Sequence, residues 1–153
     1  MEAVFHIALM NPEIGPNTGN IGRLCLGIGA HLHLIHPLGF QTDDKSVRRA
    51  GLDYWKHVDV TEHANADAFW AWAEGRTVRL FSTKAAGTYG NVQWERGDVL
   101  VFGPESKGLS EALFDRYESH RIPMTGAIRS LNLANAVAVV AYAALQRVQP
   151  DIF

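Results

Sequence analysis

Short apolar runs recur along the chain, separated by segments with helical patterning, and this alternation restricts the fold more than any other feature. The runs predict strands at 3–10, 31–36, 57–61, 77–83, 98–103 and 120–124. The segments between and after them predict helices at 21–30, 43–55, 65–75, 109–117 and 131–148. Strands that alternate with helices form a mainly parallel sheet with helices on both faces. We therefore expect an α/β fold, with residues 1–153 in a single domain.

The last predicted helix lacks a polar face. From Leu133 to Leu145, alanine, valine and leucine fill nearly every position, and Asn135 interrupts them. A helix that is apolar all round is buried all round, and a chain of this size has little besides its sheet to cover such a helix. The pattern favours a homodimer through this helix, because a second copy would supply the missing cover. A single central helix is the alternative.

Composition excludes several classes of protein. Hydrophobic residues make up 47% of the chain and its net charge is -2, which is a globular balance without a global positive field. Any binding of RNA must therefore come from a local basic patch. A lone cysteine, Cys25, argues against disulfides and thiolate metal sites, and we expect no metal. We see no signal peptide and no apolar segment long enough to cross a bilayer, so we expect a cytoplasmic protein without a membrane partner.

Three polar loops each follow a predicted strand, at 11–20, 103–108 and 124–132. The carboxyl ends of parallel strands share one edge of the sheet, where ligands bind in open α/β folds, so we expect these loops to converge. The 103–108 loop is not a Walker A phosphate loop, because Lys107 is followed by a glycine and not by serine or threonine.

The stretch "NTGNIGR" at 17–23 places Asn17 at an expected helix start and Arg23 on an otherwise apolar segment. A buried guanidinium is costly unless it meets an anion. Two alternatives stay open for Arg23: an internal ion pair with Glu13 or Glu105, or a substrate phosphate.

Ser130 and Asn132 directly precede the last helix, and either could cap it. Two polar groups, with Asn135 one turn further on, are more than a cap requires.

The histidines do not predict a catalytic or metal site. His31 and His33 would share one face of a strand, and we favour a hydrogen-bonded or solvated pair over metal ligands. The other histidines are scattered in sequence, and Cys25 on an apolar helix is interpreted as a packing residue.

Three stretches taken together, "NTGNIGR", "FGPESKGL" and "IPMTGAIRSLNLANAVAVVAYAAL", resemble the signature motifs of the SPOUT superfamily of RNA methyltransferases. Almost the full length is similar to one branch, the small bacterial tRNA (cytidine/uridine-34) 2′-O-methyltransferases, which act on leucine tRNAs. The resemblance implies a SPOUT-type α/β knot, with a trefoil knot in the carboxyl-terminal half. It also implies S-adenosylmethionine as cofactor and a homodimer built on the last helix.

Carried over by motif, the cofactor contacts implied by the resemblance are Phe81, Gly103, Ile122, Ser130, Leu131 and Leu133. A glycine at 103 would let the backbone approach the cofactor closely. We therefore expect a valine at this position to block the cofactor while leaving the fold largely intact.

The resemblance places five polar residues around the transferred methyl group: Asn17, Arg23, Glu105, Ser130 and Asn132. A ribose 2′-hydroxyl is a weak nucleophile, so alignment with the methyl group supplies much of the acceleration. Arg23 is a poor general base, because an arginine pKa exceeds about 12. It could clamp the neighbouring phosphate and favour the developing alkoxide, or relay a proton through that phosphate.

The segment 45–57 carries the basic residues that RNA would need, interleaved with Tyr54 and Trp55: Lys45, Arg48, Arg49 and Lys56. Phosphate contacts and a stacking aromatic suit a tRNA anticodon stem-loop. The alternative is a solvated surface helix whose tryptophan packs into the core. For the whole chain, the alternatives are ribose methylation of ribosomal RNA and a knotted RNA-binding module without catalysis.

Overall fold

The computed structural model describes residues 2–43 and 52–153, and within them six parallel strands form one sheet in the order β3-β2-β1-β5-β4-β6. The strands are β1 His6–Met10, β2 His31–Ile35, β3 Val60–His63, β4 Val78–Phe81, β5 Val99–Phe102 and β6 Glu118–His120. The expected α/β fold with a parallel sheet is confirmed.

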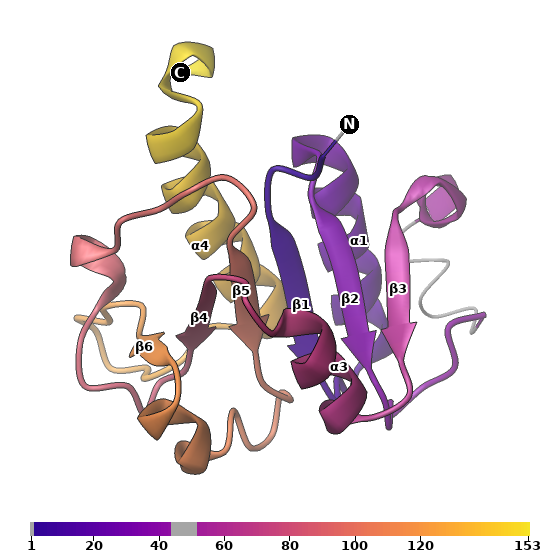
Figure 1. The fold of residues 1–153 in the computed structure, drawn as a ribbon, viewed down its shortest axis with the longest axis horizontal. Helices are drawn as coiled ribbons and strands as arrows, with labels where there is room; N and C mark the ends of the chain where they lie inside the picture. The colour runs from indigo at the N-terminus through magenta and orange to yellow at the C-terminus, as the bar shows by residue number, and fades with distance from the viewer. Residues whose placement is uncertain (1, 44–51) are drawn as a thin grey trace.

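Helices cover both faces of this sheet (Figure 1). Helix α3 (Ala66–Ala73) lies on one face, and α1 (Gly15–Ile28) and α4 (Leu133–Val148) pack side by side on the other. Short 3₁₀ turns complete the description: η1 Leu52–His57, η2 Tyr89–Asn91, η3 Glu111–Asp115 and η4 Pro150–Ile152.

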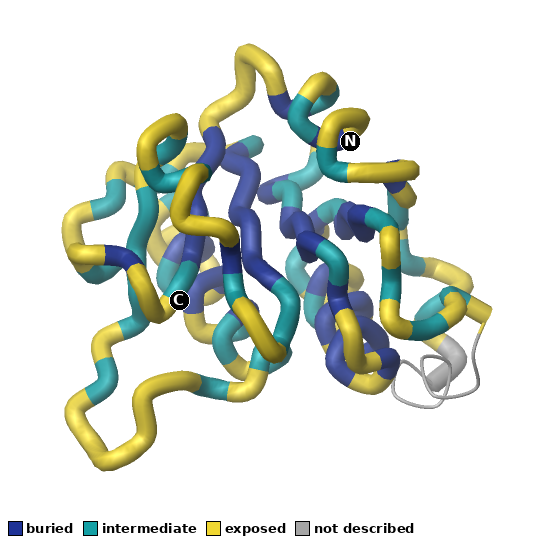
Figure 2. Tube along the Cα trace, turned by 90° about the horizontal axis from the view of Figure 1, so that it is seen from below, coloured by how far each residue is buried: buried dark blue, intermediate teal, exposed yellow. Residues whose placement is uncertain are grey.

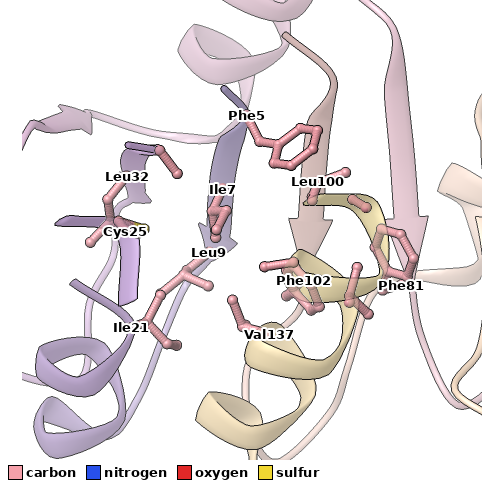
Figure 3. Packing of buried hydrophobic residues seen from close by; sticks show 14 of the residues in the cluster. Phe5, Ile7, Leu9, Ile21, Cys25, Leu32, Phe81, Leu100, Phe102 and Val137 are labelled. Carbon is pink, nitrogen blue, oxygen red and sulfur yellow. The ribbon is translucent and has the colours of Figure 1, made fainter. Parts of the chain in front are cut away.

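Alternating side chains along each strand divide the interior into two cores. On the side of α1 and α4, Ile7 and Leu9 of β1 meet Ile21 of α1 and Val137 of α4 (Figure 3). On the other side, the strand residues pack beneath α3, where Phe69 is fully buried. Figure 2 shows the buried segments at the centre of the molecule and the exposed segments in its loops.

Several expected boundaries are wrong by a few residues, and the largest error concerns α1. We expected a loop at 11–20, but the helix begins at Gly15 with Pro16 in its first turn. Proline there loses no hydrogen bond, because the first helical N–H groups have no partner within the helix. Asn17 therefore lies inside the helix.

Two other expected helices also differ from the structure. In place of the expected helix at 109–117, the structure has the short 3₁₀ turn η3, whose Leu113 and Phe114 pack against the core. Most of the expected helix at 43–55 lies outside the described residues, and its end forms η1.

The segment after β4 pairs in parallel with the segment after β6, at Thr88 and Arg121. The amide of Arg121 donates to the carbonyl of Gly87 at 2.8 Å, and the amide of Tyr89 donates back to Arg121 at 3.2 Å. These contacts lie in the carboxyl-terminal half, where the resemblance places the trefoil knot. They also fix the two loops that follow β4 and β6 relative to each other.

Candidate active site

A cavity of about 480 Å³ lies at the carboxyl ends of β4 and β5. Its walls are the residues that follow β4, the loop 103–108 after β5, residues 122, 124 and 129–132 after β6, the start of α4, and Ile14 and Asn17 near the start of α1. This volume is typical of a site for a small organic ligand. The expectation that loops converge at one edge of the sheet is confirmed for these segments.

All six residues that the resemblance suggests for the cofactor line this cavity: Phe81, Gly103, Ile122, Ser130, Leu131 and Leu133. They combine apolar side chains with exposed backbone from the loops. A nucleoside-like molecule with a sulfonium group fits this chemistry, because its adenine needs an apolar slot and backbone partners for its polar edge.

Gly103 lines the cavity, and the fold of its own loop also requires a glycine at this position. A Cβ at this position would lie 2.3 Å from the carbonyl carbon of Gly108 and 2.4 Å from the amide nitrogen of Leu109. Cβ atoms essentially never approach backbone so closely. Gly103 therefore allows the 103–108 loop to fold back on itself, and our expectation that a valine would leave the fold largely intact is wrong.

A chain of hydrogen bonds joins the three motifs at the cavity wall. Asn17, which is 8% exposed, donates from Nδ2 to Oε2 of Glu105 at 3.2 Å. Its Oδ1 accepts from Nδ2 of Asn132 at 3.0 Å. One amide thus connects a carboxylate 88 residues away with an amide 115 residues away. Three of the five expected catalytic residues are therefore brought together.

Asn132 also caps α4. Its Oδ1 accepts from the amides of Ala134 and Asn135 at 2.9 and 3.3 Å. Of the two expected caps, the structure thus uses Asn132, which leaves the exposed Ser130 on the cavity wall without a capping role.

Arg23 does not line the cavity. It is exposed on α1, and its guanidinium carbon lies 5.1 Å from the centre of the Tyr54 ring. The expectation that the Arg23 guanidinium is buried is wrong, although Ile21, Gly22 and Cys25 around it are buried. The carboxylates of Glu13 and Glu105, its two expected partners, instead accept hydrogen bonds from each other's loops.

The basic segment is only partly described. Lys45, Arg48 and Arg49 lie outside the described residues, whereas Lys56 is exposed in η1. Tyr54 is 40% exposed, but Trp55 packs against the core, where a Cβ on Gly22 would lie 2.7 Å from its ring. Of the two aromatic residues, Tyr54 is therefore the one available for stacking.

Sequence reasoning missed three cations at the cavity. Lys84 follows β4, Lys107 follows β5 and Arg129 follows β6, and each lines the wall. Their signal in the sequence is their position shortly after three strands that lie next to one another in the sheet.

The histidines form a cluster that the sequence did not predict. Nδ1 of His6 lies 2.9 Å from Nε2 of His33, and Nδ1 of His33 lies 2.9 Å from Nε2 of His63. Burial lowers the pKa of His33 to about 2 and that of His6 to about 4. Within the described residues, no group of three or more potential ligands is arranged to hold a metal ion.

Two further observations concern Cys25 and the length of the helices. Burial raises the pKa of the Cys25 thiol to about 12, which fits a packing residue and not a nucleophile. In the part of the chain that the structure describes, every helix is too short or too polar to cross a membrane.

Residues 4–142 match the model of the SpoU rRNA Methylase family. The chain belongs to this family. The resemblance to RNA methyltransferases that the three motifs suggested is thereby confirmed.

Relatives of this SpoU methylase are similar over nearly their whole length. A tRNA (cytidine(34)-2′-O)-methyltransferase from Burkholderia pseudomallei (strain 1106a) is 47% identical over 146 residues, covering 92% of this chain and 94% of the relative. The relative of the same name from Escherichia coli (strain K12) is 44% identical over 144 residues, covering 92% of both chains.

A solved structure described as giving insights into the 2-OH methylation of C/U34 on tRNA superposes with a TM-score of 0.90. It is 44% identical, and the match covers 94% of this chain and 95% of that one.

Proposed function

We propose that the protein transfers a methyl group from S-adenosylmethionine to the ribose 2′-hydroxyl of nucleotide 34, the wobble nucleotide, of tRNA, with leucine tRNAs as substrates. The observation that carries the proposal is the chain Glu105–Asn17–Asn132, which draws three distant motifs to the wall of one cavity. The relatives named for this activity share 44–47% of their residues with the chain.

In this proposal the cavity holds the cofactor through Phe81, Gly103, Ile122, Ser130, Leu131 and Leu133. When bound, S-adenosylmethionine supplies an electrophilic methyl group on sulfur. The protein aligns the ribose hydroxyl with that methyl group and excludes water, and such positioning accounts for much of the acceleration. Asn17, Glu105 and Asn132 are already locked by their mutual hydrogen bonds, so little ordering is needed when the substrates bind.

Arg23 acts on the RNA from outside the cavity of its own chain. Its planar fork suits a phosphate beside the reacting ribose. We further propose a homodimer through the outer face of α4, where Val139 and Tyr142 are 38% and 47% exposed. Because α1 packs against α4, such a dimer would bring the exposed side of α1 toward the second copy.

The anticodon stem-loop is the proposed RNA partner. Its phosphates would meet the basic segment, Lys45, Arg48, Arg49 and Lys56, and the three cations at the cavity, Lys84, Lys107 and Arg129. We also propose that residues 1–153 act as one domain, without metal or membrane association, in the cytoplasm where tRNA is found.

Ribosomal RNA is the second candidate substrate, because the family model carries that description. The experiment incubates the wild-type protein with labelled S-adenosylmethionine and, separately, leucine tRNA or ribosomal RNA, and maps the methylated ribose by mass spectrometry. We expect methylation of nucleotide 34 in tRNA. Methylation of ribosomal RNA alone would favour the second candidate, and failure to bind the cofactor would leave a non-catalytic RNA-binding module.

The same assay tests Arg23. Arg23→Lys keeps the charge but loses the planar fork, so we expect the single-turnover rate to fall about 100-fold. Cofactor affinity, measured by calorimetry, should stay within twofold of the wild type. An Arg23→Lys protein that methylates tRNA at the wild-type rate would show that the residue has no role at the reacting ribose.

A further inference from the structure

Two carboxylates connect the loops that follow β1 and β5, because each accepts hydrogen bonds from the opposite loop. The carboxylate of Glu105 accepts from the amides of Glu13 and Ile14 at 2.8 and 2.9 Å. In return, the carboxylate of Glu13 accepts from the amide and the hydroxyl of Ser106 at 2.8 and 2.7 Å. We call the three residues Glu13, Glu105 and Ser106 the carboxylate clamp.

The clamp connects two parts of the candidate site. Strands β1 and β5 are parallel neighbours, so their loops leave the sheet side by side. One loop leads into α1 and Asn17, and the other, 103–108, forms a wall of the cavity. Glu13 does not line the cavity itself, whereas Glu105 and Ser106 do. The Glu13 side chain reaches the cavity through the loop that it holds, because its hydrogen-bond partner Ser106 lies in that loop.

The hydrogen bonds of the clamp are of the strong kind, because each one that ends on a carboxylate is charge-assisted. The bonds from Ser106 hold the pKa of Glu13 below its usual value, and the charge of Lys107 acts in the same direction. The Glu13 carboxylate is thus ionised at neutral pH and stays directed at the facing loop. The same oxygen of Glu105, Oε2, accepts from the amide of Ile14 and from Nδ2 of Asn17, so the clamp and the Asn17 contact share one carboxylate.

We propose that Glu13 is a positioning residue for methyl transfer, which sets the 103–108 wall of the cavity through Ser106 and thereby the place of Glu105. The inference rests on the proposed function for its rate measurement. Its structural part, the shape of the cofactor cavity, can be measured without any RNA.

The test compares Glu13→Ala, Glu13→Gln and Ser106→Ala with the wild type. Glu13 is exposed, so all three proteins should fold, with melting temperatures close to the wild type. For Glu13→Ala we expect a roughly tenfold fall in the single-turnover rate and a severalfold weaker affinity for S-adenosylmethionine. Affinity for tRNA should stay within twofold. Glu13→Gln keeps an acceptor for Ser106 and should recover part of the loss.

Coupling provides the decisive readout. Because Glu13 acts through Ser106, the variant that combines Glu13→Ala with Ser106→Ala should lose little more rate and cofactor affinity than Glu13→Ala alone. Glu74→Ala, which removes an exposed carboxylate next to α3, is the matched control and should behave as the wild type.

Unchanged cofactor affinity and rate in folded Glu13→Ala would overturn the proposal, as would fully additive effects of the two substitutions. If the wild type binds the cofactor but leaves tRNA unmethylated, the proposed function fails separately. The cofactor affinities of the variants then still decide whether Glu13 shapes the cavity.

Discussion

At the scale of single residues, Gly103 shows that one glycine can meet two requirements at once. A glycine in a ligand-binding loop suggests close approach of a ligand, and here two parts of the loop itself also approach each other closely. The residue is needed before any cofactor arrives. Its substitution consequently tests folding as well as binding.

We expect Gly103→Ala to destabilise the protein by about 3 kcal/mol or more, because its Cβ overlaps backbone atoms that cannot move aside without unfolding the loop. Urea denaturation followed by circular dichroism measures this free energy. Gly27→Ala is the control, since nothing lies within 4 Å of a Cβ at that position. Equal stability of the two variants would contradict the account of Gly103.

Arg23 shows a second limit at this scale. Six positions separate it from Asn17, and six helical residues rotate a side chain by roughly 240° about the axis. Once α1 is known to begin at Gly15, the two side chains must therefore face different directions. Asn17 and Arg23 belong to one sequence motif, but the helix directs their side chains to different sides.

At the scale of elements, α4 follows the expectation closely in its bounds, and one of its sides is left uncovered by the single chain. It spans Leu133–Val148, where a helix at 131–148 was expected, and Val137, Val140 and Ala144 are fully buried. The outer side, however, exposes Tyr142 and Val139 in the single chain. That face is where a second copy would bind.

Tyr142→Glu is expected to weaken the proposed dimer by about 100-fold or more, because an unpaired charge buried in an interface costs about 3 kcal/mol. Analytical ultracentrifugation at micromolar concentration should find a wild-type dimer and a variant that is largely monomeric. Ala71→Glu places the same charge on the exposed side of α3 and should sediment as the wild type. A monomeric wild type would refute the dimer.

The elements also show how far the sequence alone can lead. The alternation of apolar runs with helical segments was enough to predict the parallel sheet. The fact that parallel strands end at the same edge of a sheet was enough to predict that the loops lie close together. The start of α1 was missed because Gly15, Pro16 and Gly19 favour turns as well as a helix start. The hydrogen bonds of Asn17 could not be predicted from local sequence patterns, because such patterns do not relate residue 17 to residues 105 and 132.

At the scale of the whole molecule, the histidine cluster links stability to pH. His33, 2% exposed, lies between His6 of β1 and His63 of β3, and His31, Arg76 and the ring of Trp72 also face it. A cluster that must stay neutral is stable only while its members are unprotonated. Since the pKa of His33 is lower in the folded than in the unfolded chain, the unfolded chain binds more protons below about pH 6.5.

The free energy of unfolding should therefore fall as the pH drops from 7 to 5, by up to about 2 kcal/mol from His33 alone. This window lies above the range in which Glu13 titrates, because the pKa of Glu13 is lowered. Urea midpoints at several pH values measure the slope. In His33→Leu the slope should be shallower, whereas His57→Gln, which alters an exposed histidine, should keep it. Parallel curves for all three proteins would contradict the prediction.

The Asn17–Asn132 hydrogen bond has a consequence for the order of events during synthesis. Asn17 leaves the ribosome early, with β1 and the first helix, but its partner is made only when the last helix begins. A nascent chain can build much of its sheet while the amide of Asn17 still faces water. Contacts over such long separations also form slowly. If Asn17 and Asn132 act as proposed, the site is complete only when α4 has docked, so we expect a ribosome-bound chain to be inactive until then.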